Sequence, residues 1–155
     1  MAAFWEKQSM IDQKCLECGA DLTLRAPKQR IRVGRYKVED SSARVPVCAN
    51  GHVEISLEAL AGYEHRAAIV VLSEAAAIGG AEIRFARKTV RLTQARLAAV
   101  LDVAPETVSR WENDHEPISR VSRLALLAVV RDVSSLERLD TTPAPPAEVL
   151  KVRAA

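Results

Sequence analysis

The sequence predicts an α+β protein in which a small β-rich amino-terminal module is joined by one helix to an all-helical carboxy-terminal domain. Three observations predict this class. The three cysteines all lie in the first third of the chain, among short strand-like runs. A single stretch of helically spaced apolar residues follows, ending at Gly79-Gly80. Beyond it, two short amphipathic stretches flank a tight corner at 101–103, which is typical of two helices meeting at an angle.

The length and composition agree with this division. A chain of 155 residues with 48% hydrophobic residues is long and apolar enough to fold as one large or two small domains. The predicted parts are a loose lead at 1–14, a cysteine-containing module at 15–55, a joining helix at 56–79, an all-helical domain at 80–139 and a tail at 140–155.

The amino-terminal module carries a set of metal-ligating residues. Cys15 and Cys18 form one pair followed by a glycine, and Cys48 and His52 form a second pair with three residues between them. Three thiolates and one imidazole match the tetrahedral ligand set of structural zinc. The module has few large apolar residues, so a bound metal would supply stability that its core lacks. A redox pair at Cys15 and Cys18, or buried thiols without a ligand role, are the alternatives.

Four short strands are predicted between the two ligand pairs, at 21–24, 30–33, 36–39 and 45–47. Residues 22–38 contain six basic residues and no acidic one. Such a block can contact phosphates, or it can simply keep exposed strands soluble and unpaired.

The joining helix is predicted to start at Ser56, whose hydroxyl can cap it, and to run towards the double glycine. Residues 67–72 are apolar on every helical face, so they must be buried. They can pack within their own chain or against a second copy of it, and we favour the second copy.

The carboxy-terminal domain is predicted to hold helices at about 81–89, 93–101, 105–113 and 119–131, with a further turn reaching Leu139. Val108 and Trp111 form the inner face of the third helix, whose outer face remains open to the major groove of DNA. The residues predicted to contact DNA are Lys88, Gln94, Arg96, Glu106, Thr107, Ser109, Arg110 and Asn113.

Arg110 is the expected base reader, because a guanidinium can donate two hydrogen bonds to guanine. The alternative is an exposed arginine paired with Glu106 one turn earlier. Glu106 itself can accept from cytosine or only tune the local charge. Gln94, at the start of its helix, is expected to contact the phosphate backbone. Four flanking basic residues are further candidates for sequence-independent phosphate contacts, or are ordinary surface charges: Lys88, Arg91, Arg120 and Arg123.

The stretch IRFARKTVRLTQARLAAVLDVAPETVSRWEND resembles the XRE-type, lambda-repressor-like helix-turn-helix family. The resemblance implies that Gln94, Thr107 and Arg110 face DNA, and that Arg87 pairs with Glu112 as a structural brace. The chain departs from the family at three helix ends, where Arg91, Asp102 and Asp114 stand in place of the usual glycines. Those turns require a positive φ that side chains other than Asn and Asp rarely adopt.

The order of a metal module, an apolar joining segment and an XRE-type domain resembles the MqsA family of antitoxins, which carry a YgiT-type zinc finger. That family usually has two Cys-x₂-Cys pairs, whereas the second pair here is Cys48-x₃-His52. The resemblance implies a homodimer that represses its own operon at a palindromic operator and binds a ribonuclease-type toxin through its amino-terminal module.

Other function classes lack support in the sequence. No nucleophile–base pair, phosphate-binding loop or open metal site is present, so we predict no catalytic residues and no enzyme. No apolar run approaches the length of a membrane span, and the odd cysteine count argues against a secreted disulfide framework. A cytoplasmic protein is therefore expected.

Overall fold

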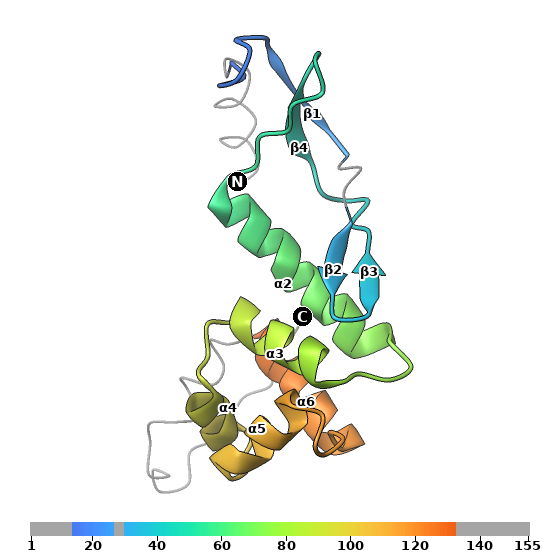
Figure 1. The fold of residues 1–155 in the computed structure, drawn as a ribbon, viewed down its shortest axis with the longest axis vertical. Helices are drawn as coiled ribbons and strands as arrows, with labels where there is room; N and C mark the ends of the chain where they lie inside the picture. The colour runs from blue at the N-terminus through green and yellow to red at the C-terminus, as the bar shows by residue number, and fades with distance from the viewer. Residues whose placement is uncertain (1–13, 27–29, 133–155) are drawn as a thin grey trace, which may run out of the picture.

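The computed structural model describes residues 14–26 and 30–132, and its α+β architecture confirms the predicted class (Figure 1). The strands are β1 Leu22–Arg25, β2 Ile31–Val33, β3 Tyr36–Val38 and β4 Val45–Cys48. The helices are α2 Leu57–Glu74, α3 Gly80–Thr89, α4 Gln94–Val100, α5 Pro105–Glu112 and α6 Arg120–Arg131. Predicted and observed bounds differ by one or two residues, except that the joining helix, predicted over 56–79, ends at Glu74. The further turn expected up to Leu139 lies outside the described residues.

The strands form two separate antiparallel pairs, a topology that strand propensity alone does not predict. β1 pairs with β4, with Leu22 opposite Cys48, while β2 and β3 form a hairpin inserted between them in sequence. The β1–β4 pair lies at one end of the molecule, and helices α3–α6 lie at the other (Figure 1). We call the first the metal end and the second the head.

The β2–β3 hairpin packs beside α2, away from the metal end (Figure 1). Val33 and Val38 on its inner face form a buried cluster with Ala67 and Val71 of α2. The alternation of strand side chains leaves Arg32 and Lys37 opposite each other on the outer face. The hairpin therefore shares a core with the joining helix.

The apolar run at 67–72 is buried largely by its own chain. The hairpin covers Ala67 and Val71, and the head covers Ala68 and Leu72, all of which are at most 3% exposed. These four residues therefore need no second copy of the chain for their burial, whereas Val70 of the same run is 37% exposed. Ser56 caps α2 as predicted, its Oγ accepting a hydrogen bond of 3.1 Å from the amide of Ala59.

A buried carboxylate attaches the hairpin turn to the start of α3. Glu82 is 2% exposed and accepts hydrogen bonds from the backbone amides of Arg35, at 2.8 Å, and Gly79, at 2.7 Å. Gly34 has φ +55°, and a Cβ there would lie 2.1 Å from Oε1 of Glu82. Only glycine fits this turn, because a side chain would strain the backbone and displace the carboxylate.

The head has a continuous apolar core built from all its helices and the end of α2. Its most deeply buried large side chains include Ile83, Leu97, Val108 and Leu126, each at most 1% exposed. Arg123 of α6 donates to three carbonyls at the end of α2: Val71, Leu72 and Ala75. Its guanidinium, a candidate phosphate contact from the sequence, is thus engaged within the chain.

The three helix ends at which the chain lacks glycine have left-handed backbones. Arg91, Asp102 and Asp114 have φ values of 56°, 53° and 56°, which confirms the expectation from the sequence. The backbone keeps the turn geometry even though the residue types suit it less well.

None of the described helices is both long enough and apolar enough to cross a membrane.

Candidate DNA-binding surface and metal centre

Helices α4 and α5 form the two arms of a helix-turn-helix. Thr93 caps α4 through a 3.1 Å hydrogen bond that its Oγ1 accepts from the amide of Arg96. The corner is closed by the amide of Val103, which donates to the carbonyl of Ala98 at 3.0 Å. Pro105 occupies the first turn of α5, where its missing N–H costs no hydrogen bond.

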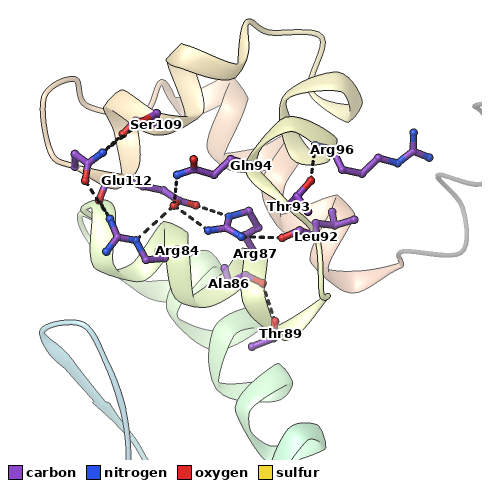
Figure 2. A network of polar contacts seen from close by, with 11 residues as sticks. Arg84, Ala86, Arg87, Thr89, Leu92, Thr93, Gln94, Arg96, Ser109 and Glu112 are labelled. Carbon is purple, nitrogen blue, oxygen red and sulfur yellow. Dashed lines mark hydrogen bonds and ion pairs between the residues drawn. The ribbon is translucent and has the colours of Figure 1, made fainter.

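A buried ion pair fixes α5 against α3 (Figure 2). Arg87 donates to both carboxylate oxygens of Glu112, from Nε at 2.6 Å and from Nη2 at 3.0 Å. Its Nη1 also donates to the carbonyl of Leu92 at 2.7 Å. The pair implied by the family resemblance is thus present, and it connects α3, α5 and the turn before α4.

Two further side chains complete this brace. Gln94 donates from Nε2 to Oε2 of Glu112 at 2.8 Å, and Arg84 donates from Nη2 to the Glu112 carbonyl at 2.9 Å (Figure 2). Burial acts to raise the pKa of Glu112, but the hydrogen bonds from Arg87 and Gln94 outweigh it and hold that pKa below its usual range. The sequence did not predict the contact of Arg84, although its position one turn before Arg87 was a usable signal.

The surface around α5 presents most of the predicted DNA contacts. Five of the eight are exposed, and three are partly buried: the exposed ones are Lys88, Arg96, Glu106, Arg110 and Asn113, and the partly buried ones are Gln94, Thr107 and Ser109. Val108 and Trp111 lie in the core as predicted, at 0% and 4% exposure. The outer face of α5 is thereby left to polar side chains.

Arg110 has a side chain that is 63% exposed. It forms a long ion pair with Glu116, at 3.9 Å, and not the pair with Glu106 considered as an alternative. Exposed pairs of this kind contribute little to stability, so the guanidinium remains available to another acceptor. Asn113 is more constrained, because its Nδ2 donates to the carbonyl of Ser109 at 2.8 Å and its Oδ1 accepts from Arg84 at 3.2 Å.

The four predicted metal ligands meet in space at the metal end. The ligand atoms of Cys15, Cys18, Cys48 and His52 all lie within 4.8 Å of one another. Cys18 Sγ lies 3.7 Å from Cys48 Sγ, and Cys15 Sγ lies 3.6 Å from His52 Nδ1. A tetrahedral zinc site with ordinary bond lengths requires about 3.8 Å between two sulfurs and about 3.6 Å between sulfur and nitrogen. The donor set and its spacing therefore fit a metal of this kind.

Each ligand pair sits on a tight turn completed by glycine. The amide of Gly19 donates to the Cys15 carbonyl at 2.8 Å, and the amide of Gly51 donates to the Cys48 carbonyl at 3.0 Å. Both glycines have positive φ, +71° and +87°, which other L-residues rarely adopt. The turns hold the ligands in place through the backbone.

The thiols of this cluster differ in acidity. Burial raises the pKa of Cys15 to about 11. Hydrogen bonds from the Ala20 amide and from Asn50 lower the pKa of Cys18 to about 6. The environment of Cys18 therefore favours the thiolate form that a metal requires, whereas Cys15 must lose a proton when a metal binds.

Comparison with known proteins supports the assignment of the head. The family model described as helix-turn-helix matches residues 83–138, which include α4, the corner and α5. No curated protein matches the chain significantly. The matched family consists of DNA-binding regulators, and so the family match and the exposed polar face of α5 together support a DNA-binding transcriptional regulator of the XRE type.

Proposed function

We propose that this protein is a sequence-specific repressor that inserts α5 into the major groove of its operator. The observation that carries the proposal is the exposed guanidinium of Arg110 on a helix whose opposite face is locked by the buried Arg87–Glu112 pair. A reading helix needs both properties, because a fixed orientation keeps the entropy cost of placing the side chain against a base low. Guanine is the preferred target of Arg110, since its O6 and N7 accept two hydrogen bonds.

The other surface residues divide into two groups by their chemistry. Lys88, Gln94 and Arg96 are donors and serve as phosphate contacts that set the register on the duplex. Glu106, Thr107, Ser109 and Asn113 lie on or directly after α5 and are the candidates for contacts to base edges. The side-chain amide of Gln94 donates one hydrogen bond to Glu112 and has a second hydrogen to donate to another acceptor.

The functional unit in this proposal is a homodimer on a palindromic operator. One head offers a single reading helix, and half-sites about 34 Å apart let two heads bind the same face of the duplex. In the same proposal the Cys₃His cluster binds zinc for a structural purpose, because four protein ligands leave no position for a reactive water.

Substitution of Arg110 tests the reading assignment. Arg110→Ala should weaken specific operator binding by about 1–3 kcal/mol and relax selection at one base pair. Lys88→Ala is the control, because loss of a phosphate contact should weaken all sequences alike and reduce the salt dependence. A gel-shift titration against the operator and a scrambled duplex separates the two effects. Equal operator affinity for Arg110→Ala and wild type would falsify the assignment.

A second proposal narrows the biological role to the antitoxin of a type II toxin–antitoxin pair. It is favoured by the order of a metal-ligand module followed by a helix-turn-helix, which is the order of the MqsA family. The partner would then be a ribonuclease-type toxin bound through the metal end. Expression of the neighbouring reading frame alone should arrest growth, and co-expression of this chain should restore it. Without such a neighbour, the chain acts as a stand-alone XRE-type regulator with a structural zinc module.

A further inference from the structure

Arg91 stands out among the three non-glycine residues with left-handed backbones. Asp102 and Asp114 belong to a residue type that tolerates this conformation, whereas arginine does not. Asp114 also has a local role, since its Oδ1 accepts a 2.7 Å hydrogen bond from the Gly80 amide. Arg91 therefore occupies an unfavourable position that its residue type does not explain.

The side chain of Arg91 makes no polar contact with the described part of the chain. It is exposed, and among the residues that the structure describes it has no hydrogen-bond or ion-pair partner. Within the described part of the chain, its one hydrogen bond is made by the backbone amide, which donates to the Lys88 carbonyl at 3.0 Å. Unfavourable backbone geometry that has no internal compensation is a reason to look for a function outside the molecule.

The positive charge near Arg91 is only partly balanced by acidic residues of the described part of the chain. Residues 83–101 contain five basic residues and no acidic one. Two of the five, Arg84 and Arg87, share the buried carboxylate of Glu112. Lys88 and Arg91 are exposed beside the turn into α4, with no acidic partner among the described residues. An anion from another molecule would meet no repulsion from within this stretch.

The position of Arg91 is fixed relative to the reading helix. The carbonyl of the next residue, Leu92, accepts from Arg87 at 2.7 Å, and Arg87 is held by Glu112 of α5. Two hydrogen-bonded steps thus connect the turn to the helix proposed to enter the major groove (Figure 2). When α5 enters the major groove, the side chain of Arg91 is therefore held at a fixed position along the duplex.

We propose that Arg91 binds a phosphate of the operator backbone next to the half-site read by α5. This inference rests on the DNA-binding function proposed above. It assigns a contact at a position where the family usually has glycine, so Arg91 would add affinity without adding sequence preference.

The test is the substitution Arg91→Gly, which restores the residue that suits the backbone. Glycine should leave the melting temperature unchanged or raise it, because a positive φ is free of strain for glycine. Operator affinity should nevertheless fall about eightfold at 0.1 M salt, and the slope of log Kd against log salt should decrease by about 0.9. Scrambled duplex should lose affinity by the same factor.

Two further variants serve as controls. Arg91→Lys keeps the charge at the same φ and should keep the salt slope. Lys37→Gln removes one positive charge from the outer face of the hairpin and should leave the slope unchanged. If Arg91→Gly binds the operator with the wild-type affinity and slope, the proposal is wrong. If the wild-type protein binds no duplex, the proposed DNA-binding function itself is wrong. If Arg110→Ala has no effect while Arg91→Gly weakens binding, the assignment of Arg110 as the base reader is wrong and the phosphate contact of Arg91 stands.

Discussion

The head and the metal end of this molecule are each stabilised by different interactions. The head buries a continuous apolar core that includes Leu97, Val108 and Leu126, all at 0% exposure. The buried cluster of the metal end consists of Cys15, Leu22 and Cys48, so two of its three members are ligand candidates. Apolar packing can stabilise the head, whereas the small apolar cluster of the metal end leaves much of the stability to a metal, if its four candidate ligands bind one. The two ends therefore differ in where their stability can come from.

Removal of the metal should produce the largest difference between the two ends. Structural zinc in small modules contributes about 10 kcal/mol or more to folding, so Cys48→Ser should abolish metal binding and unfold the β1–β4 pair. The head should stay folded, because its core contains no ligand residue. Metal analysis combined with amide hydrogen exchange would check this, with loss of protection expected in 22–25 and 45–48 but not in α3–α6.

Leu126→Ala is the matched control for Cys48→Ser, because it perturbs the core of the head instead of the metal end. It should destabilise the head by about 2–5 kcal/mol and leave the metal content unchanged. Equal loss of protection at both ends in either variant would contradict the division of the molecule into two differently stabilised regions.

The buried brace in the head should give a smaller, pH-dependent effect. The pKa of Glu112 is held below its usual value of 4.5, so its stabilisation is fully present above pH 4.5 and is lost as the pH falls through the lower value in the folded protein. Glu112→Gln should cost about 3–5 kcal/mol at pH 7, because it leaves Arg87 buried without its charge partner. Urea unfolding of both proteins from pH 7 to pH 3 should show the curves converging in acid. A constant difference at every pH would show that the carboxylate charge is not the cause.

The smallest expected effect is at the junction between the two ends. Ser56 caps α2 where the chain leaves the metal end, and Ser56→Ala should cost about 1 kcal/mol of helix stability. Hydrogen exchange should increase at 57–60 and remain unchanged in the head. Ser56→Asp is the control, since its carboxylate can cap the helix and should preserve protection.

Most helices were predictable from the sequence because their signals are local. Ser56 accepts the hydrogen bond expected of a helix cap, and Thr93 and Ser119 do the same at the starts of α4 and α6. The ligand spacing predicted which four residues meet at the metal end. The strand pairing and the partner of the apolar run at 67–72 were not predictable, because both depend on contacts between distant segments. The contact of Arg84 with Glu112 is likewise tertiary, and the DNA contacts remain predictions.

The hairpin inserted between β1 and β4 makes the chain pass between the two ends of the molecule more than once. A protease that nicks the exposed turn at Ser41-Ser42 should therefore fail to release either part. The fragment before the cut would stay bound through Val33 and Val38 against α2 and through the ion pair of Asp40 with Arg66. The two pieces should elute together on a sizing column and separate only in denaturant.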